Sequence, residues 1–336
     1  MLSSTLLLFI FTTVFGENDD CFHRNDRRDN LDTMRIIQYN VEWLFMDYCA
    51  SADCPGNGCP WKNQSDSEIH MDKIINVIDE LNPDLINFCE IEGINEINII
   101  KDTLNNKYNS YLIPGQDSST GQNVGLMTKL DPTVNLYRTE MRYEYPIIGS
   151  QCGANITGTS GVSKHYITEF IIDYMNVALI SAHLLSMPTD ADRCSKREAQ
   201  ASVLQSVIHS YVVKGYEIIM MGDFNDFDGD ILDTNENKPI SAVLDILKGR
   251  VGEYSGEYTL KSVGEYIEKS ERYSNWWDSD DNCQTSSKYD YSMIDHILVS
   301  DAIREKIDNV FIYHKYDEYC GKYDSDHYPV VIDLII

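Results

Sequence analysis

The amino-acid sequence predicts an α/β protein with mixed β-sheets. Short apolar runs of strand-like composition alternate with helical patterns along nearly the whole chain. Several of these runs follow one another without an intervening helix, which argues against the all-parallel sheet of a simple βαβ repeat. No linker or internal repeat divides the 336 residues, and a 43% hydrophobic content is enough for a sizeable core. A single domain is therefore favoured.

Nine apolar runs are expected to form strands. In chain order they cover residues 34–43, 84–91, 110–114, 124–129, 165–174, 177–185, 217–224, 292–300 and 327–336. Two stretches have helical spacing, Ser67 to Leu81 and Lys196 to Val213. Their apolar faces are expected to carry Ile69, Ile74, Ile75 and Ile78 in the first helix, and Ala199, Val203, Val207 and Ile208 in the second. The composition between Asp228 and Asp281 predicts long loops with one short helix near Ala242 to Leu247.

The first sixteen residues are expected to be a secretory signal peptide. They form an apolar run that ends with Val14 and Gly16 ahead of Glu17, which suits cleavage near Gly16. The run is shorter than the roughly 18 apolar residues that a membrane span needs, so no stable membrane insertion is expected. A polar segment follows over residues 17–33, and the single domain is expected over residues 34–336.

The nine cysteines predict disulfides, because an oxidising compartment would follow from the signal peptide. An odd number leaves at least one thiol unpaired, and Cys89 is the candidate because it lies inside an apolar run. Cys49, Cys54 and Cys59 recur at short intervals, but tight structural zinc sites favour two-residue gaps and a fourth ligand nearby. Disulfides are therefore preferred over zinc for these three.

Two N-x-S/T sequons, at Asn63 and Asn155, suit a glycosylated surface. Together with the signal peptide they predict a secreted, extracellular protein or one in the lumen of the secretory or lysosomal pathway. A monomer is expected.

The formal net charge of -27 excludes a protein that holds nucleic acid through a broad basic face. An enzyme that acts on phosphates remains compatible with this charge, because a bound divalent cation can invert the field that a substrate meets. The alternative explanation is that the acidic surface keeps an exported protein soluble.

Five polar clusters occur where an apolar run ends or begins. They are Asn40 with Glu42, Glu90, His183, Asp223 with Asn225, and Asp326 with His327. Strand ends hold side chains more rigidly than loop tips, which is what catalysis requires. A single histidine or Gly-Asp turn of this kind is more often structural, so the argument depends on all five clusters occurring together.

The clusters contain the groups needed to hydrolyse a phosphate ester, namely charge neutralisation, an activated water and a proton for the leaving oxygen. Carboxylates at Glu90, Asp223 and Asp326 suit Mg²⁺ or Mn²⁺. His183 and His327 are candidates for acid–base catalysis or phosphate contact, because imidazole titrates near neutral pH.

The order YNVEW, FCEIEG, ISAHL, GDFND, IDHILVS, SDHYPVV resembles the endonuclease/exonuclease/phosphatase superfamily, also called deoxyribonuclease-I-like. The resemblance runs from about Met34 to Ile336, and GDFND and SDHYP separated by IDHI are its most specific part. It implies a four-layer α/β sandwich in which two mixed sheets pack face to face with helices outside.

The resemblance also implies roles for the matching residues. Those on the metal side would be Glu90, Asn40, Glu42 and Asp326. Asp223 would orient or deprotonate the attacking water, and Asn225 would hold the phosphate or the metal. The residues at the scissile phosphate would be His183 and His327, with Asp295 paired to His327. His183 makes the site more similar to secreted nucleases and sphingomyelinases than to apurinic-site repair enzymes.

The family often places a Tyr or Arg in a central strand to contact phosphate, and Tyr166 and Arg142 are the candidates here. Arg193 and Arg197, in a basic patch beyond the His183 strand, are further candidates for substrate contact. The alternative for this patch is a solvated helix start in which Arg197 pairs with acids.

Two Asp-rich stretches, residues 225–230 and 276–282, place oxygens at alternate positions as calcium loops do, so Ca²⁺ is an alternative ion. Neither has the downstream Glu of an EF-hand. Trp276 and Trp277 would suit stacking on bases or contact with lipid, although packing over a loop is commoner.

The sequence therefore predicts a secreted, divalent-metal-dependent phosphodiesterase, with a nuclease acting on DNA or RNA as the first choice. A sphingomyelinase-like enzyme or a phosphoesterase for nucleotides or inositol phosphates is the alternative, because specificity lies in loops. A non-catalytic binding protein is less favoured, since His183, Asp223 and His327 are all present. A serine or cysteine hydrolase lacks a G-x-S-x-G elbow and a cysteine paired to a base.

Overall fold

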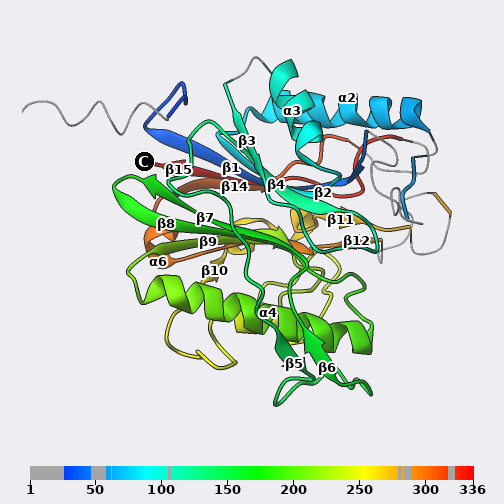
Figure 1. The fold of residues 1–336 in the computed structure, drawn as a ribbon, viewed down its shortest axis with the longest axis vertical. Helices are drawn as coiled ribbons and strands as arrows, with labels where there is room; N and C mark the ends of the chain where they lie inside the picture. The colour runs from blue at the N-terminus through cyan, green and yellow to red at the C-terminus, as the bar shows by residue number, and fades with distance from the viewer. Residues whose placement is uncertain are drawn as a thin grey trace, which may run out of the picture.

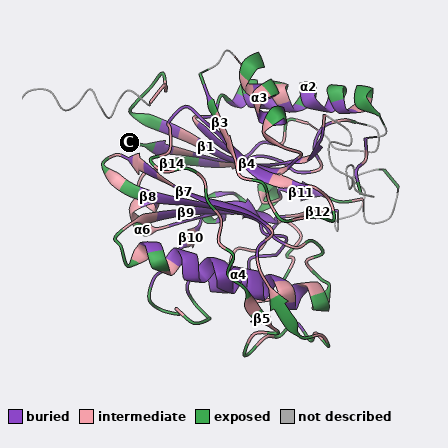
Figure 2. Cartoon of the chain, viewed as in Figure 1, coloured by how far each residue is buried: buried purple, intermediate pink, exposed green. Residues whose placement is uncertain are grey.

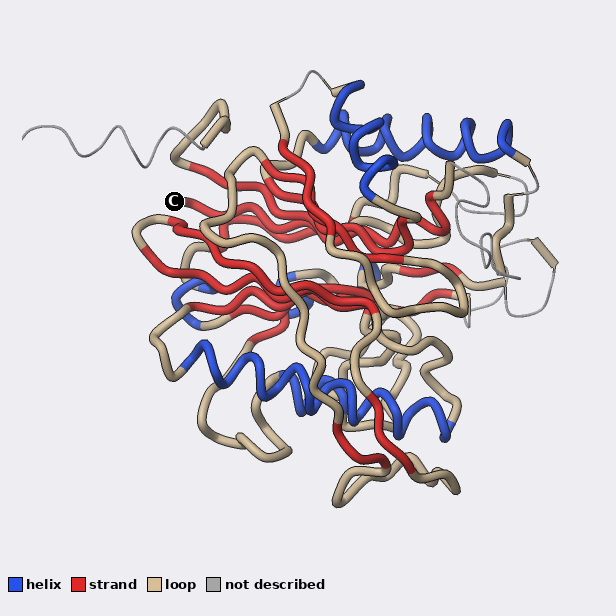
Figure 3. The backbone as a smooth tube through the Cα atoms, in the orientation of Figure 1, coloured by secondary structure: helices blue, strands red, loops and turns tan. Residues whose placement is uncertain are grey.

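Two mixed β-sheets lie face to face, and helices cover the outer face of each (Figure 1 and Figure 3). The computed structural model describes residues 26–46, 58–61, 63–104, 107–278, 282–283, 290–316 and 322–336. The expected signal peptide, most of the polar segment after it, and Cys49 and Cys54 fall outside these ranges. The predicted four-layer α/β sandwich is confirmed.

The first sheet has six strands in the order β14-β15-β1-β2-β4-β3. Their bounds are β1 Thr33–Leu44, β2 Leu85–Ile91, β3 Asn109–Leu112, β4 Asn123–Thr128, β14 Ile307–Ile312 and β15 Val330–Ile335. Only β1 and β2 run parallel, and every other neighbouring pair is antiparallel. The parallel pair brings the carboxyl ends of β1 and β2 to the same edge of the sheet.

The second sheet has five strands in the order β10-β13-β9-β8-β7. Their bounds are β7 Lys164–Ile172, β8 Met175–His183, β9 Glu217–Asp223, β10 Lys261–Ser262 and β13 Asp295–Val299. Here β8 and β9 are the parallel pair, so these two strands also end side by side. Two short hairpins, β5 Tyr143–Tyr145 with β6 Gly158–Ser160 and β11 Asn275–Trp276 with β12 Tyr291–Ser292, lie outside the main sheets.

The helices divide between the two outer faces. Helices α2 Gln64–Leu81 and α3 Ile94–Thr103 pack on the first sheet, and α4 Ala191–Val212 and α5 Val243–Leu247 pack on the second. A short helix, α6 Asp301–Arg304, connects β13 to β14. None of the described helices is both long and apolar enough to cross a membrane.

Strand alternation explains the layers, because successive side chains of a strand point to opposite faces. In β1, Met34 and Ile36 join the core between the sheets, whereas Ile37 and Tyr39 join the core under α2. Figure 2 shows the central strands as buried along most of their length. The central strands are thus apolar on both faces, which is why their sequences are apolar runs without clean alternation.

The nine predicted strands all appear, but the helix predictions needed correction. Helix α2 begins at Gln64, where Asn63 caps it by accepting the Asp66 amide at 3.1 Å. Its buried face holds His70, Met71 and Ile74, among others, while Ile69 is 40% exposed, so Ile69 was wrongly placed on that face. The spacing of isoleucines misled because Ile69 and Ile75 lie beside the buried face, which polar His70 shares.

Helix α4 starts five residues earlier than predicted, because Asp190 accepts the Arg193 amide at 2.7 Å and caps it. All four of its predicted core residues are buried. The predicted short helix appears as α5. Strand β14 and helix α3 were not predicted: Asp308 and Asn309 interrupt the apolar run of β14 at a register shift, and α3 is too isoleucine-rich to read as helical.

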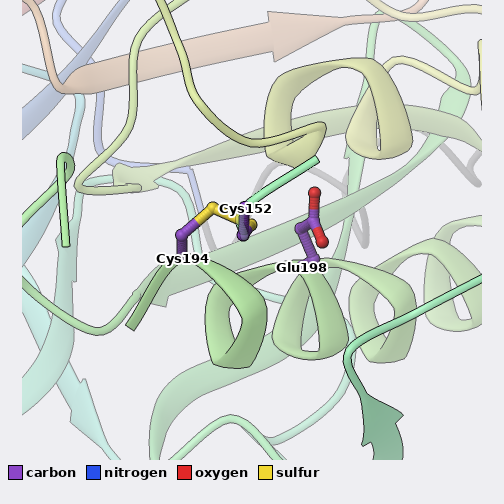
Figure 4. A group of neighbouring side chains, drawn as sticks. All are labelled: Cys152, Cys194 and Glu198. Atoms are coloured by element: carbon purple, nitrogen blue, oxygen red, sulfur yellow. A yellow bond between two sulfur atoms is a disulfide. The ribbon is translucent and has the colours of Figure 1, made fainter. Parts of the chain in front are cut away.

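A disulfide joins Cys152, beyond β5, to Cys194 in the first turns of α4 (Figure 4). Both residues are buried, and Glu198 lies beside the bond with its Oε1 accepting the Ala242 amide at 2.9 Å. Cys89 is buried and unbridged, as predicted. The disulfide closes a loop of 42 residues. It links the segment of residues 143–160, which carries β5 and β6 and is called the β5–β6 arm below, to helix α4.

Replacing Cys152 and Cys194 together by alanine is expected to lower the free energy of unfolding by about 2–4 kcal/mol, because the unfolded chain regains the entropy of the open loop. Urea denaturation followed by circular dichroism measures the loss. Either single replacement should cost as much as the double one, since either opens the bridge. An unchanged midpoint in all three variants would mean that the bridge does not constrain the chain.

Candidate active site

The polar clusters of the sequence meet where the carboxyl ends of the parallel strands of both sheets face each other. The strand face that points between the sheets carries apolar residues first and polar residues at the carboxyl end. On this face Ile36 is followed by Asn40 in β1, Leu179 by His183 in β8, and Met221 by Asp223 in β9. Asp223 lies opposite Asp295 of β13 in the sheet register. One edge of the interface between the sheets therefore gathers the reactive groups.

Three residues at these strand ends have left-handed backbone conformations, Glu42 at φ 43°, Glu90 at φ 67° and Asn225 at φ 50°. Such conformations cost about 1 kcal/mol or more for residues other than glycine and persist only where neighbours hold them. Hydrogen bonds do so here: Asn40 Oδ1 accepts the Glu42 amide at 3.1 Å, and Asp223 Oδ1 accepts the Asn225 amide at 2.9 Å. The backbone is bent to turn these side chains into one site.

Gly222 precedes Asp223 and admits no side chain. A Cβ at this position would overlap the carbonyl of Ala182 in β8. The Gly of GDFND is therefore required by the close approach of two backbones, and it lets β9 end directly beside His183.

Asn40 is the centre of the cluster. Its Nδ2 lies 3.0 Å from Asp223 Oδ2, 3.2 Å from Glu90 Oε1 and 3.4 Å from His327 Nε2. The amide is completely buried and so links the two sheets through both carboxylates. Glu90 is held further by Gln122, whose Nε2 donates to Glu90 Oε2 at 2.8 Å.

His327 is paired with Asp295. Its Nδ1 lies 2.6 Å from Asp295 Oδ2, which also accepts the Ser274 hydroxyl at 3.0 Å. Burial alone would lower the pKa of His327, but the carboxylates of Asp295 and Asp326 outweigh burial and raise this pKa well above its ordinary value. The protonated ring is favoured, so its Nε2 faces the cluster as a donor and the 3.4 Å approach of Asn40 Nδ2 is a contact, not a hydrogen bond.

His183 has the opposite charge state. Burial, with repulsion from Lys164 and His327, holds the pKa of His183 well below its ordinary value, so the ring is neutral. Its Nε2 lies 3.4 Å from Asp223 Oδ2 and 3.8 Å from Glu90 Oε1, and its Nδ1 is buried without a hydrogen-bond partner in the described part of the chain. The pKa values of the two histidines shift in opposite directions because His327 is paired closely with Asp295, whereas burial and nearby positive charge dominate at His183.

The carboxylates fit a divalent cation. Burial, followed by the charge of Asp295, raises the pKa of Asp223 to about 7, and burial raises that of Asp326 to about 7 as well. One ligand atom from each of Glu90, His183 and Asp223 falls within 4.8 Å of the others, which is close enough to share an ion. Asp223 and Asp326 resist ionisation, and together with Glu90 they form an oxygen-rich site suited to a hard cation.

Asp326 and Glu42 lie at the outer side of this group. Glu42 Oε2 accepts the Asp326 amide at 3.0 Å, and Asp326 Oδ1 lies 3.8 Å from His327 Nε2. Asn225 lies at the other side, where its Nδ2 donates to the carbonyl of Leu184, next to His183, at 3.2 Å. All nine predicted catalytic and metal residues therefore lie in or beside one cluster.

Lys164 is a site residue that the sequence analysis missed. It pairs with His183 in the register of β7 and β8, is 8% exposed, and its Nζ lies 3.1 Å from Gln122 Oε1 and 3.4 Å from Asp117 Oδ2. The predicted strand began one residue later, at His165. The available signal was the alternation itself, because Lys164 is two residues before inward-facing Tyr166.

Two predicted substrate contacts are wrong because their side chains are fully buried and already bonded. Tyr166 lies between the sheets and its hydroxyl donates to Asn87 Oδ1 at 2.8 Å. Arg197 pairs with Asp226 at 3.0 Å. Its remaining donors hold the carbonyls of Leu185, Ser186, Met187 and Pro188. Arg197 therefore shapes the loop after His183, and the alternative in which it pairs with an acid is the better description.

The other two candidates stay near the surface. Arg142 is exposed and donates to Thr159 across the β5–β6 arm, and none of its described bonds reaches the cluster. Arg193 is half-buried and donates to Ser186 Oγ at 2.9 Å, beside the loop that Arg197 holds.

The first calcium loop is not supported. In residues 225–230, the Lys248 ammonium occupies the acidic position, with its Nζ 2.6 Å from Asp228 Oδ1 and 3.5 Å from Asp230 Oδ2. The second stretch, 276–282, lies partly outside the described residues. Its two tryptophans differ in exposure: Trp276 is 5% exposed and packs in the core, whereas Trp277 is 67% exposed.

Replacing Arg197 by lysine is expected to lower the free energy of unfolding by about 1–3 kcal/mol, because an ammonium keeps the charge beside Asp226 but leaves buried carbonyls without donors. Replacement by alanine should lower the free energy of unfolding further, by about 3–5 kcal/mol, because it leaves the buried Asp226 carboxylate without its cationic partner. Denaturant titration measures both. The matched control is Arg193→Lys, half-buried on the same helix, which should change stability little, and equal losses at both positions would contradict this role.

Comparison with known proteins identifies the family and the fold of this protein. Residues 37–327 match the model of the Endonuclease/Exonuclease/phosphatase family. No curated protein sequence matches the chain. Among solved structures, an AP endonuclease from Archaeoglobus fulgidus superposes with a TM-score of 0.59 at 13% identity, over 90% of this chain and 100% of that one.

Two further solved structures share the fold with similarly low sequence identity. The endonuclease/exonuclease/phosphatase from Bacteroides vulgatus has a TM-score of 0.53 at 15% identity, and truncated TDP2 from Caenorhabditis elegans has 0.53 at 13%. Each covers 90% of this chain and 98% of its own. Because the family model spans most of the chain, this protein belongs to the endonuclease/exonuclease/phosphatase family.

Proposed function

We propose that this protein is a divalent-metal-dependent phosphodiesterase of the secretory pathway, and that its substrate is a nucleic acid. The observation that carries the hydrolytic part is the cluster in which Asn40 joins Glu90, Asp223 and His327 within 3.4 Å. It combines a cation-binding group of carboxylates with an imidazolium and a carboxylate that titrates near neutral pH.

The proposed roles follow from charge and position. Asp223, which accepts from Asn40 at 3.0 Å and lies 3.4 Å from His183 Nε2, orients the attacking water. His327, fixed by Asp295, donates to a phosphoryl oxygen or to the leaving oxygen. Neutral His183 and the ammonium of Lys164 lie on the adjoining strand pair and contact the phosphoryl group from that side.

Mg²⁺ or Mn²⁺ held by Glu90, Asp223 and Asp326 would neutralise charge on the phosphoryl oxygens, with Ca²⁺ as an alternative. Asn40 and Glu42 brace these ligands through the hydrogen bonds already described. Asn225 supplies an amide at the rim that suits contact with phosphate.

A nucleic acid is favoured over a lipid by the surroundings of the site. Trp277 is 67% exposed and follows Trp276, whose amide donates to the Asp326 carbonyl at 2.8 Å, so an exposed aromatic residue is next in sequence to one that contacts the site backbone. Such a ring suits stacking on a base. Trp276 is buried, so of these two tryptophans only Trp277 is available to a ligand. Half-buried Arg193 adds one cation near the His183 loop.

Export is supported by the apolar first sixteen residues and by the Cys152–Cys194 disulfide. Of the two sequons, Asn155 is exposed, whereas the Asn63 side-chain amide donates to Asp66 Oδ2 at 3.1 Å and caps α2. Asn155 is therefore the better glycosylation site.

Purified protein with Mg²⁺ is expected to cleave plasmid DNA or RNA faster than sphingomyelin vesicles, nucleoside monophosphates or an inositol phosphate, and a chelator should abolish cleavage. Substitutions Asp223→Ala and His327→Ala are each expected to lower kcat by about 10²–10⁴, the usual worth of a general acid or base. The matched control is Asp308→Asn, an exposed carboxylate on β14, which should keep wild-type activity. Preferential cleavage of sphingomyelin would overturn the substrate, and no cleavage of any ester would overturn the function.

Mg²⁺ is expected to raise the melting temperature more at pH 8 than at pH 5.5. Without a cation, Asp223 and Asp326 have pKa values raised from 3.8 to about 7, so the folded state binds more protons than the unfolded state between these values and loses stability as pH rises across that window. Protons compete with the cation below pH 7. In Asp223→Asn the difference between the two pH values should shrink. An equal shift at both pH values would argue against these carboxylates as ligands.

A further inference from the structure

A chain of buried polar side chains crosses the core between the sheets and ends on the carboxylate that holds His327. Its members are Tyr166 on β7, Asn87 on β2, Gln38 on β1 and Asp295 on β13, all at most 1% exposed. The Tyr166 hydroxyl donates to Asn87 Oδ1 at 2.8 Å, Asn87 Nδ2 donates to Gln38 Oε1, and Gln38 Nε2 donates to Asp295 Oδ1 at 3.1 Å. Every donor in the chain points toward Asp295.

This direction fixes the orientation of the Gln38 amide. A flipped amide would set its oxygen against the Asp295 carboxylate and its nitrogen against the Asn87 donor, and both contacts would be repulsive. The second Gln38 hydrogen is directed at Cys89 Sγ, 3.5 Å away. Gln38 therefore presents one defined N–H to Asp295 Oδ1, while Oδ2 accepts from Ser274 and His327.

Packing does not explain why this row of hydrogen-bonded side chains is polar. The surrounding inter-sheet core is apolar, with Leu85, Met221 and Ile297 among its members. Apolar side chains of the same size would fill the space, because a buried polar pair adds little net stability over an apolar replacement. A fully satisfied buried network instead gives rigidity and a defined geometry.

We propose that Gln38, oriented by Asn87 and Tyr166, is a positioning residue that fixes the Asp295 carboxylate against His327. This role rests on the proposed hydrolytic function and adds a residue with no contact to substrate. With both Asp295 oxygens anchored, the His327 ring has one allowed orientation, and its Nε2 is aimed into the cluster.

The test compares Gln38→Met in the wild-type and Asp295→Asn backgrounds, together with Gln38→Met/Asn87→Leu/Tyr166→Phe, which removes the buried polar groups of the network together and so protects the fold. With bis(p-nitrophenyl) phosphate and Mg²⁺, both variants are expected to lose about tenfold in kcat with little change in KM, the scale of one lost hydrogen bond to a charged group. In the Asp295→Asn background Gln38→Met should have no further effect. The matched control is Thr168→Val, because Thr168 is a buried polar residue of β7 that takes no part in these hydrogen bonds. This variant should keep wild-type kcat.

A second readout does not need activity. In protein with ¹⁵N-labelled histidine, the His327 Nδ1–H bonded to Asp295 should give a far-downfield proton signal, assigned by its loss in His327→Gln. Gln38→Met should shift or broaden it, and Thr168→Val should not. An unchanged signal in Gln38→Met, or an equal loss of kcat in both backgrounds, would overturn the proposal. If the wild type hydrolyses no phosphate ester, the proposed function fails, and the proton signal alone still decides the role of Gln38.

Discussion

The hydrogen bonds that Asn40 makes across the gap between the sheets are the constraint on which the site depends. A single buried amide bonds Glu90 of its own sheet at 3.2 Å and Asp223 of the other sheet at 3.0 Å, so the second bond ties the two sheets together at this edge. Everything else in the site is placed relative to that contact. Because the amide is neutral, it joins two carboxylates without cancelling their charge, and the demand for a cation remains.

The electrostatics of the site follow from the same closeness. Carboxylates brought together in a buried place resist ionisation, which explains the pKa values near 7 of Asp223 and Asp326. The carboxylates of Asp295 and Asp326 outweigh burial and raise the pKa of His327, whereas burial, with Lys164, lowers the pKa of His183. A net charge of -27 over the whole chain would repel a polyanion, so attraction must come from a cation and from local groups such as Lys164.

Buried residues that do not line the site hold its loops and strand ends in place. Arg197 holds the loop after His183 through four carbonyls and anchors to Asp226, three residues beyond Asp223. Gly222 allows β9 and β8 to approach each other at their ends. These contacts are buried and contribute no group to the surface, yet they decide where His183, Asp223 and Asn225 stand.

The sequence by itself determined nine strands of the two main sheets, the α/β class and most of the reactive residues, because apolar runs and the polar residues that follow them are local patterns. Asn40, His183, Asp223 and His327 could be named from their positions at strand ends. Only the tertiary structure decided which of these groups touch, because that depends on sheet order and register between strands far apart in the chain. It moved Arg197 and Tyr166 from substrate contact to buried support and brought Lys164 opposite His183. Burial depends on what packs against a side chain, which residue type and local spacing do not specify.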